Sequence, residues 1–249
     1  MLHILNGSAL LNKFPKAIEG TRLVCHECFV EGPVKADSLK QLGIIRSQFL
    51  YETYNAPYED YISKMVLPFD VLGILDTEVE IHLWFEEDLF CQTNMWYMIH
   101  LLMHYKLDNK IFLVRPHTSL QFGFGALDAK GLEEVFPNKE HISYTDLIQF
   151  DALWFAYSRG DNNAMKRVGE SLCKNYSFVH RAIEAHFQRQ ENGLDIGLPK
   201  ATLIEISNQL GTKDFGTVFR EFSKRLPIYG FGDLQVKRLW EEILVSGTP

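Results

Sequence analysis

Residues 79–92 read Val-Glu-Ile-His-Leu-Trp-Phe-Glu-Glu-Asp-Leu-Phe-Cys-Gln, and this stretch decides the fold. The apolar run at 79–85 predicts a strand that ends in three carboxylates, Glu86, Glu87 and Asp88, before a helical pattern begins. A strand that leads directly into a helix is half of a βαβ unit. Ligands of open parallel sheets bind just beyond the carboxyl ends of the strands, so we expect a functional site beside these carboxylates.

The same alternation extends along the first half of the chain. Apolar, β-rich runs predict strands at 2–5, 22–29, 79–85 and 110–114, and helical spacing predicts helices at 39–49, 58–75 and 88–105, the second one broken near Pro68. Strands that alternate with helices predict an α/β fold, here a Rossmann-like open parallel sheet with flanking helices in residues 1–125. Residues 118–142 contain several glycines and little periodicity, which places a domain boundary or a long loop there.

Residues 140–249 are predicted to form an all-helical C-terminal domain. Apolar residues recur at three-and-four spacing in 145–158, 163–173, 177–189, 199–210, 215–226 and 233–244. The pair 199–210 and 215–226 is compatible with a helix-turn-helix, whose second helix would carry a modest basic face of Arg220, Lys224 and Arg225. The motif Tyr-Gly-Phe-Gly-Asp at 229–233 predicts a tight turn before the last helix.

Composition and charge exclude several classes of protein. A chain of 249 residues with 46% hydrophobic residues can bury a core, and a net charge of -7 argues against a surface devoted to nucleic acid. Four irregularly spaced cysteines do not form a disulfide scaffold, and no apolar stretch approaches the ~20 residues of a membrane span. We therefore expect a cytoplasmic protein without membrane association. The sequence indicates no particular cofactor and no oligomeric state.

The turn after the first strand is a candidate for anion binding. Asn6-Gly7-Ser8 lies between a strand and a helix, where backbone amides can approach an anion and where Asn6 or Ser8 can cap the helix. The chain has neither a Gly-x-Gly-x-x-Gly motif nor a Gly-Lys-Ser/Thr pair. A tight turn with a capping residue explains the motif equally simply.

Carboxylates at the strand ends are the candidates for catalysis. Glu86 can act as a general base, bind a cation or hold a ligand hydroxyl, whereas Asp88 is placed to cap the following helix, in which Gln92 can contribute an amide. Glu27 is the second catalytic candidate. Glu31, followed by Gly32-Pro33, is a ligand-binding candidate or simply part of a loop. Arg115 or His117 would supply a positive charge.

The sequence does not favour a metal site. Cys25 and Cys28 are three apart in a predicted strand and so point to opposite faces, and no second Cys-x-x-Cys exists. His100 and His104 lack the glutamate of a zinc-protease helix.

These motifs together resemble a bacterial domain-of-unknown-function family, number 1835. The resemblance spans nearly the whole chain and is carried by His3-Ile4-Leu5-Asn6-Gly7, by Glu27 with Glu31-Gly32-Pro33, by Trp84-Phe85-Glu86-x-Asp88-Leu89-Phe90-Cys91-Gln92-x-Asn94, and by Tyr229-Gly230-x-Gly232-Asp233. The family pattern has Asp where this chain has Ser8, and often Arg where it has His26, so no catalytic role is carried over to these two residues. The resemblance implies the location of a site but no reaction.

Two functions fit these observations. In the first, the protein binds a small phosphorylated or nucleotide-like ligand at the strand ends and acts on it through Glu86 and Glu27, with Asn6, Gly7 and Ser8 as the anion cradle. In the second, the helical domain binds DNA or a protein partner, and the α/β half serves as a sensor or scaffold.

Overall fold

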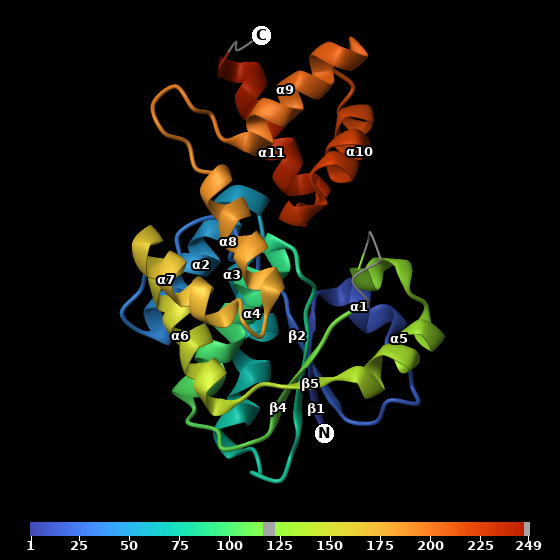
Figure 1. Ribbon diagram of the computed structural model, residues 1–249, viewed down its shortest axis with the longest axis vertical. Helices are drawn as coiled ribbons and strands as arrows, with labels where there is room; N and C mark the ends of the chain where they lie inside the picture. The colour runs from blue at the N-terminus through green and yellow to red at the C-terminus, as the bar shows by residue number, and fades with distance from the viewer. Residues whose placement is uncertain (117–122, 247–249) are drawn as a thin grey trace.

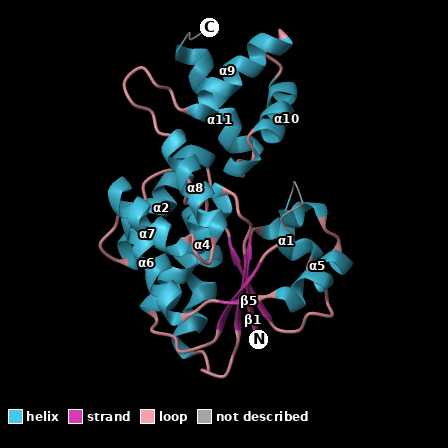
Figure 2. Cartoon of the chain, in the orientation of Figure 1, coloured by secondary structure: helices cyan, strands magenta, loops and turns pink. Residues whose placement is uncertain are grey.

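A computed structural model of the chain describes residues 1–116 and 123–246. It contains a five-stranded sheet between helical layers, with a small group of helices beyond one end of the sheet (Figures 1 and 2). The strands are β1 (Leu2–Asn6), β2 (Thr21–Cys25), β3 (Ile81–Trp84), β4 (Ile111–Val114) and β5 (Glu140–His141). The α/β fold class predicted from the sequence is thus confirmed.

The strand order β2-β1-β3-β4-β5 creates a position where the chain changes direction across the sheet. The first four strands are parallel, and β5 pairs with β4 in the antiparallel sense. From β1 the chain passes to β2 on one side and then crosses to β3 on the other. The carboxyl ends of β1 and β3 therefore flank a topological switch point, the usual ligand site of such sheets.

The two faces of the sheet are covered unequally. Alternate strand residues such as Ile4 and Leu83 face a large core, whereas Leu5 and Trp84 face a smaller one. The smaller core is covered by α1 (Ser8–Lys13) and α5 (Ala129–Val135). The larger face carries α2 (Leu39–Tyr54), α3 (Tyr58–Tyr61), α4 (Leu89–His104), α6 (Tyr144–Arg159), α7 (Asn162–Leu172) and α8 (Ser177–Gln188).

The last three helices form a separate group, which we call the C-terminal module. It consists of α9 (Leu198–Leu210), α10 (Phe215–Arg225) and α11 (Asp233–Ser246), with a 3-10 turn at Pro227–Tyr229. Figure 1 shows this module beyond the carboxyl end of the sheet, and the rest of the chain is the α/β body. None of the helices within residues 1–116 and 123–246 is long and apolar enough to cross a membrane.

The helices predicted in residues 140–249 divide between the body and the C-terminal module. The six helices predicted in residues 140–249 are present with ends within two residues of the prediction, but α6, α7 and α8 belong to the body. The reason is α4, whose side chains are buried on nearly every side. A helix that is buried all round needs cover on the side that faces away from the sheet, and α6 and α8 pack there.

Three smaller expectations are corrected or refined. The second strand ends at Cys25 and not at residue 29, because the chain turns there and the Phe29 N–H donates to the Asn94 side chain. The helix predicted at 58–75 is broken as expected, with a π-helical turn at Ile62–Val66 before a 3-10 segment at Leu67–Ile74 that contains Pro68. The stretch 118–142 is not only a loop, since its described part contains α5 and β5.

Candidate functional site

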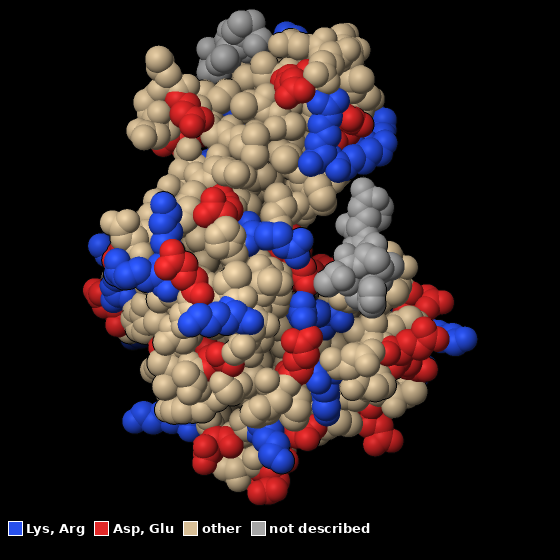
Figure 3. All heavy atoms as spheres, in the orientation of Figure 1, with Lys and Arg blue, Asp and Glu red and all other residues tan. Residues whose placement is uncertain are grey.

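A cleft of about 580 Å³ lies between the carboxyl ends of β1 and β3 and the C-terminal module. The molecule narrows between the module and the body in the space-filling view (Figure 3). The body lines the cleft with Asn6, Glu86, Glu87, Asp88, Phe90, Cys91, Pro116, Gly123 and Arg181, and the module lines it with Phe222, Ser223, Leu226, Pro227, Ile228, Gly230 and Phe231. The cleft thus joins an acidic floor to a mainly apolar wall.

Glu86 stands directly beyond β3 in the floor of the cleft. Its Oε1 accepts a hydrogen bond from the Phe124 N–H, and its Oε2 accepts one of 3.4 Å from the Cys91 thiol. Burial, and then the neighbouring Asp88 charge, raise the pKa of Glu86 to about 7. Both protonation states of Glu86 are therefore populated near neutral pH.

Asp88 caps α4, as the sequence predicts. Its Oδ1 accepts a hydrogen bond of 2.9 Å from the Cys91 N–H, and burial raises its pKa. Two glycines make room for the two acids. A Cβ at Gly230 would lie 1.9 Å from Asp88 Oδ1, and one at Gly123 would lie 2.0 Å from Glu86 Oε1. The turn at 229–232 of the module is therefore in direct contact with the floor of the cleft.

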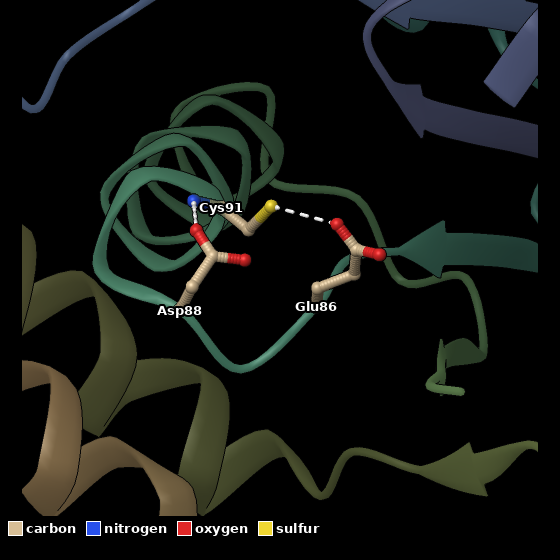
Figure 4. Close-up of side chains that lie close together, drawn as sticks. All are labelled: Glu86, Asp88 and Cys91. Atoms are coloured by element: carbon tan, nitrogen blue, oxygen red, sulfur yellow. Dashed lines mark hydrogen bonds between the residues drawn. The ribbon is translucent and has the colours of Figure 1, made fainter. Parts of the chain in front are cut away.

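Cys91 completes a compact group with Glu86 and Asp88 (Figure 4). One possible ligand atom from each of the three lies within 4.8 Å of the others, the arrangement in the described part of the chain that could hold a metal ion. Burial, followed by the charges of Asp88 and Glu86, raises the pKa of the Cys91 thiol well above its ordinary value. The thiol is therefore a proton donor to Glu86 in this structure, and metal binding would require its proton to leave.

Asn6 belongs to the site through a chain of amide contacts. Its Nδ2 donates to Cys91 Sγ at 2.9 Å, and its Oδ1 accepts from Asn94 Nδ2 at 2.9 Å. Asn94 also donates to the carbonyl oxygen of Glu27 at 2.7 Å. Gln92, fully buried, donates to the carbonyl oxygen of Glu86 at 2.7 Å. These amides hold the ends of β1 and β3 together, so Gln92 positions Glu86 instead of facing a ligand.

Glu27, the second predicted catalytic residue, lies away from the cleft. Its carboxylate is buried and accepts from Arg46 Nη2 at 2.7 Å and from Arg46 Nε at 3.1 and 3.2 Å. It also accepts from the Cys28 N–H at 3.0 Å. The Glu27 carboxylate is thus held in a buried ion pair with Arg46 and does not line the cleft, which favours a structural role over the predicted catalytic one.

The turn after β1 does not form the expected anion cradle. Gly7, with φ of 85°, is the N-cap of α1 and no side chain caps this six-residue helix, which corrects the expectation that Asn6 or Ser8 does so. Ser8 is exposed and its nearest polar partner is His26, at 3.4 Å. Neither Gly7 nor Ser8 is among the described residues that line the cleft.

Glu31 and Arg115 are not among the residues that line the cleft. Glu31 borders a second cavity of about 180 Å³, where Tyr54 and Arg238 donate to its carboxylate. Arg115 pairs with Glu87 and with Glu140, at 2.6 Å in both cases. His117 lies outside the described residues.

Arg181 is a charged residue of the cleft that the sequence did not indicate. It lies on α8, lines the cleft and donates to Glu87. Its position depends on the packing of α8 against α4, and no local motif marks it.

No protein-family model matches this chain, and no curated protein or solved structure is significantly similar to it.

Proposed function

We propose that the protein binds a small phosphorylated or nucleotide-like ligand in the cleft at the ends of β1 and β3. The cleft volume of about 580 Å³ falls within the range of small-molecule sites. The apolar residues of the wall, Phe222, Ile228 and Phe231 among them, suit a flat ring. The carboxyl groups of the floor suit hydroxyl or amine donors of a sugar or base.

Glu86 carries this proposal. A buried carboxyl group with a pKa of about 7, in a cleft at a topological switch point, is typical of a group that exchanges protons or hydrogen bonds with a ligand. Catalysis on the bound ligand, if the protein is an enzyme, would act through Glu86 as general acid or base. The resemblance to domain-of-unknown-function family 1835 includes this residue and stays a prediction.

A thermal-shift and calorimetric screen with nucleosides, nucleotides and sugar phosphates tests the proposal. At least one compound should stabilise the wild type, and Glu86→Gln should weaken its binding by about tenfold or more, since a charge-assisted hydrogen bond is lost. Glu133→Gln, on the exposed side of α5, is the matched control and should bind normally. The proposal fails if no compound stabilises the wild type or if Glu86→Gln binds as tightly as Glu133→Gln.

The alternative, nucleic-acid binding by the module, has one observation in its favour. Lys and Arg side chains gather over α10, with acidic side chains among them (Figure 3). Arg225 is partly neutralised by Glu221 at 2.8 Å and Glu205 at 3.3 Å, so Arg220 and Lys224 would carry the binding. DNA affinity that falls steeply with salt and is lost in the Arg220→Gln/Lys224→Gln double variant would support this alternative, and salt-independent or absent binding would remove it.

A further inference from the structure

The charges around the cleft are unevenly distributed. Three acidic side chains line its floor, Glu86, Glu87 and Asp88. Among the lining residues that the structure describes, Arg181 is the single positively charged side chain. An anionic group of a ligand would be repelled by the floor unless it lay against Arg181.

Glu87 has two arginine partners, and they differ in how firmly they are held. Arg115 donates to Glu87 Oε1 at 2.6 Å, donates to Glu140 with its other terminal nitrogen, and lies 4.7 Å from the centre of the Phe178 ring. Its side chain is 20% exposed, whereas that of Arg181 is 59% exposed. Arg115 alone can neutralise Glu87. The contact between Glu87 and Arg181 is therefore the exchangeable one.

The pair between Glu87 and Arg181 has one exposed partner, so water competes for Arg181 and the pair contributes little to stability. A guanidinium group binds phosphate or carboxylate oxygens through two parallel hydrogen bonds, which are stronger and more specific than a single contact. An anionic ligand could thus replace Glu87 as the partner of Arg181 at little cost, while Glu87 stays paired with Arg115.

We propose that Arg181 is the anion-binding residue of the cleft and takes a phosphate or carboxylate group of the ligand in exchange for Glu87. This inference rests on the proposed function and names the ligand class more narrowly, as one that carries an anionic group at the α8 side of the cleft. The anion site of this proposal is therefore not the turn after β1 but α8, which is the last helix of the body along the chain.

Inorganic phosphate is the simplest probe, because it carries only the anionic group. It therefore tests the site at Arg181 separately from the ring of an organic ligand, which Glu86 and the apolar wall would contact. Thermal shift and calorimetry at constant ionic strength should show saturable phosphate binding to the wild type. Arg181→Gln should weaken this binding by about tenfold or more. Arg167→Gln, an exposed residue of α7, removes the same charge and should leave phosphate binding unchanged.

Glu87→Gln provides a change in the opposite direction. This substitution removes the carboxylate that competes with phosphate for Arg181, so it should tighten phosphate binding severalfold. The Glu87→Gln/Arg181→Gln double variant should lose this gain in affinity. Phosphate also stabilises folded proteins by exclusion from their surfaces, but that effect would be equal in all variants.

Two outcomes would overturn the inference. One is the absence of saturable phosphate binding to the wild type. The other is equal phosphate binding by Arg181→Gln and Arg167→Gln. Either result leaves the proposed function to be judged by the organic ligands and Glu86→Gln, so the two failures are distinguishable.

Discussion

Three consecutive acidic residues have three different roles because each points into different surroundings. Glu86 is buried beside Cys91 and Phe124, Glu87 is paired with two arginines, and Asp88 caps α4. Burial, and then the Asp88 charge, raise the pKa of Glu86 to about 7, while its hydrogen bonds from Phe124 and Cys91 act in the opposite direction. Of the three carboxyl groups, Glu86 is the one to which we assign the proposed function.

Glu86 should reduce stability at alkaline pH. Its pKa in the folded protein, about 7, lies above the ordinary value of 4.5, so the folded state holds the proton more tightly than the unfolded state. The stability that this provides is complete below pH 4.5 and is lost as the pH rises through 7. Glu86→Gln should therefore be more stable than the wild type by about 3 kcal/mol at pH 8 and about equally stable near pH 4.5. Urea unfolding at pH 4.5, 6 and 8 measures this difference, with Glu133→Gln as control, and a pH-independent difference would contradict it.

At the scale of elements, β1 and β3 are joined by a pair of buried histidines as well as by the site. His3 and His82 are opposite in the register of the two strands, and their rings stack with centres 4.9 Å apart. Trp84 Nε1 donates to His3 Nδ1 at 3.1 Å, which fits a neutral ring. Burial lowers the pKa of both, that of His82 to about 4, and the Lys139 charge acts in the same direction.

The histidine pair should make the sheet sensitive to acid. Because the pKa of His82 is lowered from 6.5 to about 4 in the folded protein, its contribution to stability is complete above pH 6.5 and is lost as the pH falls toward 4. The free energy of unfolding of the wild type should decrease between pH 7 and pH 4, and in His82→Gln this decrease should be smaller by about 2 kcal/mol. His104→Gln, at an exposed position of α4, should keep the wild-type pH dependence. Chemical unfolding of the three proteins between pH 7 and pH 4 measures this difference. Parallel profiles of unfolding free energy against pH for the wild type and His82→Gln would refute the prediction.

At the scale of the whole molecule, the C-terminal module forms one wall of the cleft and is fastened to the body by Glu31. Arg238 of α11 donates to Glu31 at 2.6 Å, Tyr54 of α2 donates to the same carboxylate, and Gln235 donates to the Tyr54 hydroxyl at 3.3 Å. Phe231 lines both the cleft and the second cavity beside these residues. The position of this wall therefore depends on contacts that lie outside the cleft.

Loosening this attachment should make the module more dynamic. Arg238→Gln removes an ion pair in which Glu31 is 6% and Arg238 39% exposed, worth about 1 kcal/mol. Amide hydrogen exchange in α9, α10 and α11 should become about fivefold faster, while α4 and α6 remain unchanged. Lys237→Gln, on the exposed side of the same helix, is the control. Equal exchange in the two variants would show that apolar packing alone holds the module.

The sequence by itself determined most of the elements and their order, and it indicated where the candidate site lies. Alternating strands and helices, the polar ends of β1 and β3 and the six late helices are all local patterns, which depend on neighbouring residues and on the periods of strand and helix. For the same reason Asp88 was recognisable as a cap. The two-residue β5 was not recognisable, because its pattern is too short.

Only the tertiary structure decided which polar residues share the cleft. Glu27 and Glu86 look equivalent at the ends of their strands, yet Glu27 meets Arg46 from α2 and is neutralised, whereas Glu86 meets neutral donors. Arg181 reaches the cleft because α8 packs against α4, and Gly230 does so because the module lies over the strand ends. Such partners come from residues distant in the chain, and their burial and pairing depend on how whole elements pack, which no local pattern records.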